Sequence, residues 1–167
     1  MILRRFEDND AVDCFESLSD EETCLLDGGY QSFDKMDDEY NRLMDTFKKQ
    51  ETRYMIVLKE ENKVIGTINL MDINDRCVET MEVGYEVSPN YRRKGYAYEA
   101  ISSLLKFLLD DLHLDMVIAG IFEENTKSIK MLEKLGFSVE GRKHNALWVH
   151  NKGPVDLFYY YLERSRN

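Results

Sequence analysis

Three consecutive cations stand immediately before a glycine in the stretch EVSPNYRRKGYAYEA. They are Arg92, Arg93 and Lys94, followed by Gly95; a strand-like run ends near Val87, and a helix-like run begins near the glycine. The first turn of a helix has backbone N–H groups that lack an internal acceptor and carry partial positive charge, which suits a phosphate or pyrophosphate. A glycine has no Cβ, so the backbone there can approach such a ligand closely. The stretch therefore predicts a polyanion site with mobile cations at its mouth, and an ordinary basic helix start is the alternative.

Other phosphate-binding and metal-binding patterns do not match the sequence. The Walker A pattern Gly-x-x-x-x-Gly-Lys-Ser/Thr is absent, and so is the dinucleotide pattern Gly-x-Gly-x-x-Gly. The three cysteines, Cys14, Cys24 and Cys77, include no Cys-x-x-Cys pair, and the three histidines include no i,i+4 pair. We therefore expect neither a metal site nor a disulfide framework.

Acidic residues are concentrated near the N-terminus. Residues 7–45 contain fourteen Asp and Glu against only Lys35 and Arg42, and the whole chain has a formal net charge of −10. This bias predicts either a solvated surface or an electric field that attracts a cationic substrate, such as an amine. A chain this acidic is not expected to bind nucleic acid, which calls for basic patches.

Hydrophobic periodicity predicts the elements that must position these residues. Helical spacing marks 10–25, 36–50, 97–112 and a segment that follows Asn125 and stops at Gly136. Strand-like runs occupy 2–6, 53–59, 63–72, 78–87, 116–122, 137–142, 146–150 and 155–162. The order predicts an α+β or mixed α/β fold around one central sheet, with 1–167 as a single domain.

Composition bounds the class of protein. The chain has 167 residues, 43% of them hydrophobic and 32% charged, as in globular proteins. No apolar run approaches the roughly 20 residues that span a bilayer, and MILRRFEDND lacks the apolar core of a signal peptide. The expectations are a cytoplasmic location and no membrane partner.

Three motifs, in order along the chain, resemble one known family. Val87-x-x-x-x-Arg92-x-x-Gly95-x-Ala97 resembles the acetyl-CoA signature of the GNAT N-acetyltransferases. ENTKSIKMLEKLGFSVEGR, at 124–142, is similar to the second half of that domain. NKGPVDLFYYYL, at 151–162, resembles the closing strand of the branch with the ribosomal-protein alanine and the spermidine acetyltransferases. The implied fold is a mostly antiparallel mixed sheet, splayed at the acetyl-CoA site and flanked by helices.

The resemblance implies acetyl-CoA as cosubstrate. The backbone of Tyr85 and Val87 would pair with the pantetheine arm, and the Val87 N–H would act as oxyanion donor. The amides of residues 93–97 would hold the pyrophosphate, and Asn125 would bind the pantetheine or cap a helix. The implied cofactor-binding residues are Tyr85, Val87, Arg92, Arg93, Lys94, Gly95, Tyr96, Ala97, Asn125 and Ser128.

Catalytic roles follow from the same resemblance. Glu82 matches the Glu of the branch's Glu-Ile-Gly-Tyr-like strand and is predicted to be the base, acting through a water, with Glu86 as the second candidate. Alternatively, these acids only face solvent or bind the substrate ammonium. Leu132 stands where many members have a Tyr acid, so Ser128 is the predicted acid unless water suffices.

The implied activity is acetyl transfer to a primary amine. A protein N-terminal α-amine is the first candidate acceptor, a polyamine or other small amine is the alternative, and a non-catalytic acyl-CoA-binding domain is the rival from another class. The acceptor pocket is expected to form from the N-terminal helices, the 27–34 loop and residues 142–150. Members of the family are often dimers, which makes a homodimer a candidate assembly.

Overall fold

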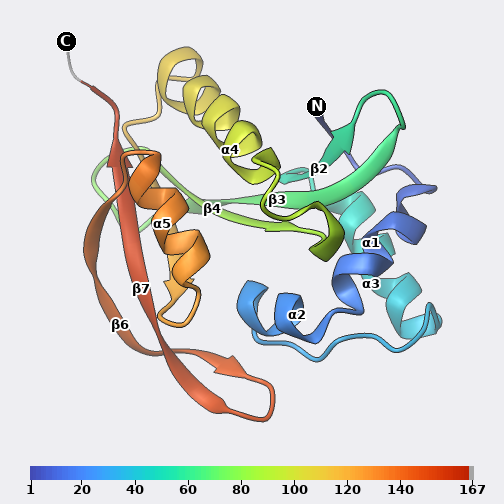
Figure 1. Cartoon of the computed structure of the whole chain (residues 1–167). Helices are drawn as coiled ribbons and strands as arrows, with labels where there is room; N and C mark the ends of the chain where they lie inside the picture. Colours follow the sequence, from blue (N-terminus) through green and yellow to red (C-terminus); the bar gives the residue numbers. More distant parts are fainter. Residues whose placement is uncertain (166–167) are drawn as a thin grey trace. The chain divides into compact units, whose positions relative to one another are not determined.

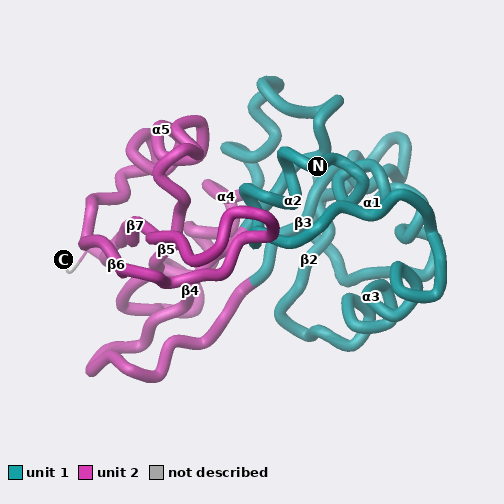
Figure 2. Tube along the Cα trace, turned by 90° about the horizontal axis from the view of Figure 1, so that it is seen from below, with its two compact units in different colours: residues 1–69, 85–100 teal, residues 70–84, 101–167 magenta. Residues whose placement is uncertain are grey.

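The computed structural model describes residues 1–165 of the chain (Figure 1). The chain forms two compact units, shown in separate colours in Figure 2. Unit 1 consists of residues 1–69 and 85–100, and unit 2 of residues 70–84 and 101–167. The chain passes from one unit to the other inside two strands and one helix, and each unit is described by itself below.

Seven strands hydrogen-bond in the order β1-β2-β3-β4-β5-β7-β6. The pairs β1–β2, β2–β3, β5–β7 and β6–β7 are antiparallel, whereas β4 and β5 pair in parallel. The strands are β1 Ile2–Arg4, β2 Arg53–Leu58, β3 Lys63–Ile73, β4 Thr80–Val87, β5 Met116–Phe122, β6 Ser138–Val149 and β7 Gly153–Glu163. The prediction of an α+β fold with a mostly antiparallel mixed sheet is confirmed.

Unit 1 contains three N-terminal helices, α1 Asp10–Leu18, α2 Glu21–Asp27 and α3 Asp38–Lys49. The apolar faces of α1 and α3 pack on β2 and β3 in one buried cluster: Cys14, Leu18, Tyr40, Met44, Phe47, Met55, Val57 and Val64. The single helix predicted over 10–25 is wrong, because the chain breaks between α1 and α2. Asp20 is extended there, and its side chain accepts a hydrogen bond from the Thr23 N–H, so it caps a new helix.

The strands of unit 1 approach one another closely at Gly66. A Cβ built on Gly66 would lie 2.3 Å from the Glu86 carbonyl oxygen, which fixes a glycine at this position. The Ser88 N–H donates to the Ile65 carbonyl at 2.8 Å, just beyond the end of β4. After β4, a short 3₁₀ turn, Pro89–Tyr91, leads to the loop before α4, Tyr96–Lys106.

Unit 2 contains β5, β6, β7 and the helix α5, Thr126–Lys134. A π-helical turn over Phe107–Asp111 continues α4. Two strands were predicted over 137–142 and 146–150, whereas the structure has the one long strand β6. Its register against β7 shifts twice, and Asn145 has φ 49°. The sequence of this irregular part of the strand resembles that of a turn, which explains the wrong prediction.

None of the helices in residues 1–165 is both long enough and apolar enough to cross a membrane.

Candidate functional site

The glycine loop before α4, which is the predicted anion cradle, contains two residues with positive φ. Gly95 has φ +85° and Arg93 has φ +60°, so two left-handed residues turn the chain into the helix. A Cβ built on Gly95 would meet no atom of the described chain within 4 Å. The glycine is therefore required by its backbone angle, and the space beside it is open.

Arg92 is held in place, which contradicts the expectation that its charge is mobile. Its Nε donates to the Val87 carbonyl at 3.0 Å, and its terminal nitrogens lie 3.4 Å from carboxylate oxygens of Asp20 and Glu22. It also donates to the Thr23 hydroxyl. Arg92 thus ties the end of β4 to the first turn of α2, and acidic side chains neutralise much of its charge.

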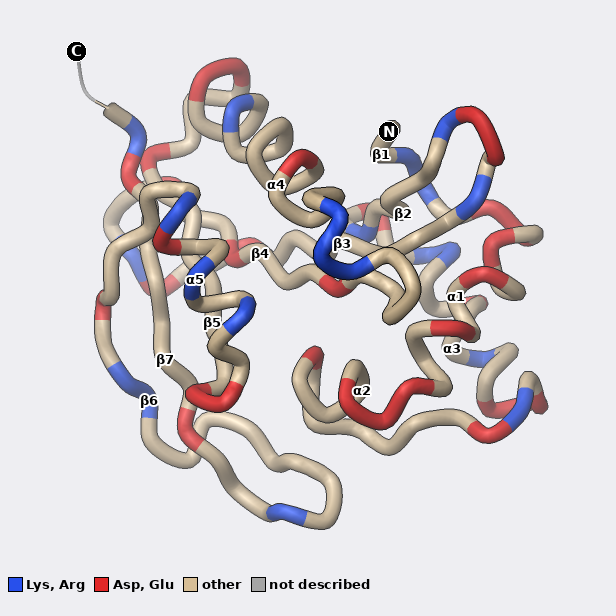
Figure 3. The backbone as a smooth tube through the Cα atoms, in the orientation of Figure 1, with Lys and Arg blue, Asp and Glu red and all other residues tan. Residues whose placement is uncertain are grey.

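Arg93 and Lys94 are the exposed cations of this loop. Lys94 Nζ lies 5.1 Å from the centroid of the Tyr91 ring, a cation–π contact at the surface. Figure 3 shows the basic segment at the start of α4 and the acidic segments of α2. Because Arg92 is paired with acidic side chains, the positive charges of this loop that face solvent are those of Arg93 and Lys94.

A pocket of about 600 Å³ opens in unit 1 beside the three N-terminal helices. Residues of α3 line one side, and strand residues of β2, β3 and β4 line another. Its lining is Leu18, Asp27, Tyr30, Gln31, Phe33, Glu39, Arg42, Leu43, Thr46, Phe47, Arg53, Thr67 and Glu86. The helices and the 27–34 loop were predicted to form an acceptor pocket, whereas residues 142–150 do not belong to this lining.

Glu86 is the carboxylate that β4 contributes to this pocket. Its Oε2 atom is shielded from solvent and has no hydrogen-bond partner among residues 1–165. Burial raises the pKa of Glu86 to about 8 and nearby Asp27 adds to the rise, while Ser17, Arg53 and Arg92 oppose it. The alternative that Glu86 only faces solvent is therefore wrong.

Arg53 is fixed by its neighbours in the same pocket. Its Nε donates to the Gln50 side chain at 2.7 Å, and one terminal nitrogen donates to the Thr67 hydroxyl at 3.2 Å. The guanidinium also stacks over the Phe47 ring, 4.0 Å from its centroid. Sequence reasoning missed this role, because an arginine at the start of a strand becomes a pocket residue only through tertiary packing.

Glu82 is the predicted base, and it lies in unit 2 beside β5 and β7. β4 and β5 pair from Thr80↔Met116 to Glu82↔Ile118. Burial raises the pKa of Glu82, while a hydrogen bond with the Gly120 backbone and the charge of Lys143 oppose the rise. The carboxylate is half-buried, so it has both limited solvent access and a proton affinity above that of an ordinary Glu.

Asn125 caps α5, one of the two roles that the sequence left open for it. Its side chain accepts a hydrogen bond from the Ser128 N–H at 3.2 Å. Ser128 is half-buried in the first turn of the helix. Leu132 is fully buried, so the position where a Tyr acid was sought is part of the apolar core of unit 2.

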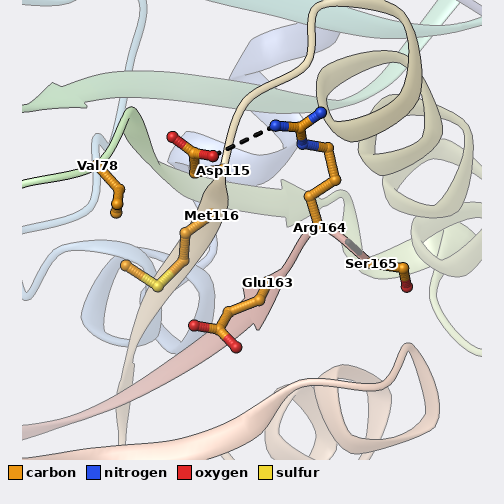
Figure 4. Close-up of a pocket in the computed structure, with 6 residues that line it drawn as sticks. All are labelled: Val78, Asp115, Met116, Glu163, Arg164 and Ser165. Atoms are coloured by element: carbon orange, nitrogen blue, oxygen red, sulfur yellow. Dashed lines mark hydrogen bonds and ion pairs between the residues drawn. The ribbon is translucent and has the colours of Figure 1, made fainter. Parts of the chain in front are cut away.

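A second pocket, of about 560 Å³, lies in unit 2 near the end of β7. Figure 4 shows Asp115 and Arg164 joined across it, at 3.3 Å. The Arg164 N–H also donates to the Asp115 carbonyl at 2.8 Å. Because these opposite charges already bind each other and none of the predicted site residues lines this pocket, we regard it as structural.

No group of three or more His, Cys, Asp or Glu side chains within the described chain is placed to hold a metal ion.

Comparisons with known proteins agree on one family. A family model described as an acetyltransferase (GNAT) domain matches residues 1–138. The uncharacterized N-acetyltransferase YoaA of Bacillus subtilis is 28% identical over 171 residues, covering 99% of this chain and 94% of that protein. The uncharacterized N-acetyltransferase p20 of Bacillus licheniformis is 39% identical over 95 residues, a match that spans 55% of this chain and 51% of that protein. A solved GNAT-family acetyltransferase from Bacillus anthracis has a TM-score of 0.83 at 26% identity, covering 98% of this chain and 95% of that one.

Relatives named for a substrate are of two kinds. A spermidine N(1)-acetyltransferase of Vibrio cholerae is 25% identical, and the match covers 74% of this chain and 69% of that protein. A ribosomal protein uS5-alanine N-acetyltransferase of Escherichia coli is 24% identical, and the match covers 59% of this chain and 52% of that protein. Similarity therefore leaves the acceptor of this chain open.

Proposed function

The chain belongs to the GNAT family of N-acetyltransferases, and on this premise we propose that it transfers the acetyl group of acetyl-CoA to a primary amine. A protein N-terminal α-amine is the first candidate acceptor, and a polyamine or another small amine is the second. The observation that carries the proposal is the glycine loop, in which Arg93 and Gly95 are left-handed and open space adjoins the glycine.

The loop is proposed to bind the pyrophosphate of acetyl-CoA. The backbone N–H groups of residues 93–97 belong to the start of α4 and the loop before it, where a helix attracts negative charge. Arg93 and Lys94 add exposed positive charge, while Arg92 positions the loop through Val87. The pantetheine arm would then pair with the backbone of Tyr85 and Val87, as the resemblance to the family implies.

The proposed reaction is a direct displacement. The amine nitrogen attacks the thioester carbonyl carbon, so an N–C bond forms and the C–S bond breaks. Glu82 takes the surplus proton of the amine through a water, and Glu86 is the second candidate for this task. The raised pKa of Glu82 suits a base that works near neutral pH. The Val87 N–H stabilises the developing oxyanion.

The leaving thiolate needs a proton from a side chain or from water. Ser128 is the proposed donor, since Leu132 is fully buried and has no proton to give. The same leucine favours the second candidate function, a non-catalytic acyl-CoA-binding domain. Release of CoA in the presence of amines, followed with a thiol reagent, separates the two: binding of acetyl-CoA without turnover of any amine would contradict the enzyme.

Calorimetry of acetyl-CoA binding tests the loop itself. Gly95→Glu places bulk and negative charge beside the proposed pyrophosphate, so we expect the affinity to fall on the order of 100-fold. Gly153→Glu is the matched control, because Gly153 has φ +87° and also has open space around it, but lies at the start of β7, away from the loop. Equal affinities of the two variants would contradict the assignment.

A further inference from the structure

The pocket of unit 1 contains charges of both signs. Asp27, Glu39 and Glu86 contribute carboxylates, and Arg42 and Arg53 contribute guanidinium groups. A polyamine carries positive charge alone, so each guanidinium of the lining would repel it. The lining therefore fits a ligand that is itself of mixed charge.

The two arginines are available to a ligand. Arg53 lines the pocket, and Gln50, Thr67 and the Phe47 ring hold its guanidinium in one orientation. Arg42 lies on the exposed pocket-lining face of α3, three residues after Glu39. A planar guanidinium suits a carboxylate, which it binds through two parallel hydrogen bonds.

Glu86 offers the complementary group at the strand side of the pocket. Its shielded Oε2 lacks a partner in the described chain, although a buried polar atom is normally hydrogen-bonded. A ligand ammonium would supply the missing donors. The apolar walls, which include Leu18 and Phe33, would cover the carbon atoms between the two charged groups.

We propose that the acceptor is an α-amine with a carboxylate close by, with the ammonium at Glu86 and the carboxylate at Arg53 and Arg42. The inference rests on the proposed function and narrows its acceptor. Two sources share this chemistry: a free amino acid, and the first residue of a peptide when its side chain is acidic. A polyamine lacks the carboxylate and meets the arginines as like charges.

Matched acceptors test the proposal in one kinetic assay of CoA release. One pair is alanine and alaninamide, and the other is Glu-Ala-Ala-amide and Gln-Ala-Ala-amide, with spermidine as the polyamine. We expect the carboxylate-bearing member of at least one pair to exceed both its neutral partner and spermidine by on the order of tenfold in kcat/KM. The pair that shows the difference identifies the source.

Two substitutions connect this preference to the pocket. Arg42→Gln should reduce the ratio between charged and neutral partners through KM, and Arg42→Glu should move the preference toward spermidine. Lys49→Gln is the matched control, because Lys49 is an exposed cation of α3 that does not line the pocket. Turnover without a preference for the carboxylate, or with equal ratios in Arg42→Gln and Lys49→Gln, would overturn the inference and leave the proposed function standing. No turnover of any amine would overturn both.

Discussion

Two carboxylates lie four residues apart on β4, and their surroundings differ. Glu82, in unit 2, is half-buried and hydrogen-bonded to the Gly120 backbone, with Lys143 nearby. Glu86, in unit 1, lines a pocket of mixed charge and has one shielded oxygen without a partner in the described chain. Burial raises the pKa of both carboxylates, to about 8 at Glu86, and the groups around them also differ. On this contrast we propose Glu82 for proton transfer and, with the proposed acceptor, Glu86 for ammonium binding.

Replacement of the proposed base should have the largest effect. Glu82→Gln keeps the shape of the side chain but removes proton acceptance, so kcat should fall on the order of 100-fold at neutral pH. Steady-state kinetics with a saturating acceptor measure this loss, and calorimetry should show unchanged acetyl-CoA affinity. An unaltered kcat and pH profile would remove Glu82 from the mechanism.

Replacement of Glu86 should act on acceptor binding instead. At pH 8 and above, where the Glu86 carboxylate ionises, Glu86→Gln should raise the acceptor KM about tenfold and change kcat little, because the ammonium loses its counter-charge. The wild-type KM should fall as the pH rises toward 8 and the carboxylate ionises, and the variant should lose this dependence. A larger loss of kcat in Glu86→Gln than in Glu82→Gln would indicate that Glu86 is the base and would contradict the proposed roles.

A glycine beside Glu82 offers a smaller perturbation. A Cβ on Gly120 would lie 3.0 Å from Glu82 Oε1 and 3.3 Å from the Tyr159 ring, so Gly120→Ala should displace the carboxylate. We expect kcat to fall about fivefold, without a change in acceptor KM. Gly141→Ala is the control, since nothing in the described chain lies within 4 Å of a Cβ there. Equal kinetics of the two variants would contradict the assigned position of the base.

The smallest expected effect is on the free energy of unfolding, which Glu86→Gln should change in a pH-dependent way. Between its ordinary pKa of 4.5 and the raised value of about 8, the native state binds more protons at Glu86 than the unfolded state. The contribution of Glu86 to the free energy of unfolding therefore falls as the pH rises through this window. Glu86→Gln removes the slope and should gain about 1–3 kcal/mol over wild type by pH 8. Denaturant titrations at several pH values measure it, and a pH-independent difference would contradict it.

The sequence predicted the strands, the helices and the glycine loop because each follows from local periodicity or from one required backbone angle. Gly136 is left-handed, as a glycine that ends a helix commonly is, whereas Gly95 was predicted only for its missing Cβ and is left-handed as well. The break at Asp20 was missed because the apolar pattern of a helix continues across it, although Asp20 is also a residue type that caps a new helix. Only part of the pocket lining was predicted. Arg53 of β2 and Glu86 of β4 line the same pocket, and no sequence spacing indicates that these two strands contribute to it.

Acetyl transfer is the central claim, and its most direct measurement combines acetyl-CoA with the matched acceptors and spermidine. Released CoA should match, mole for mole, the acetylated amine identified by mass spectrometry, and Glu82→Gln should lower both together. Tight binding of acetyl-CoA without any acetylated amine would contradict the account.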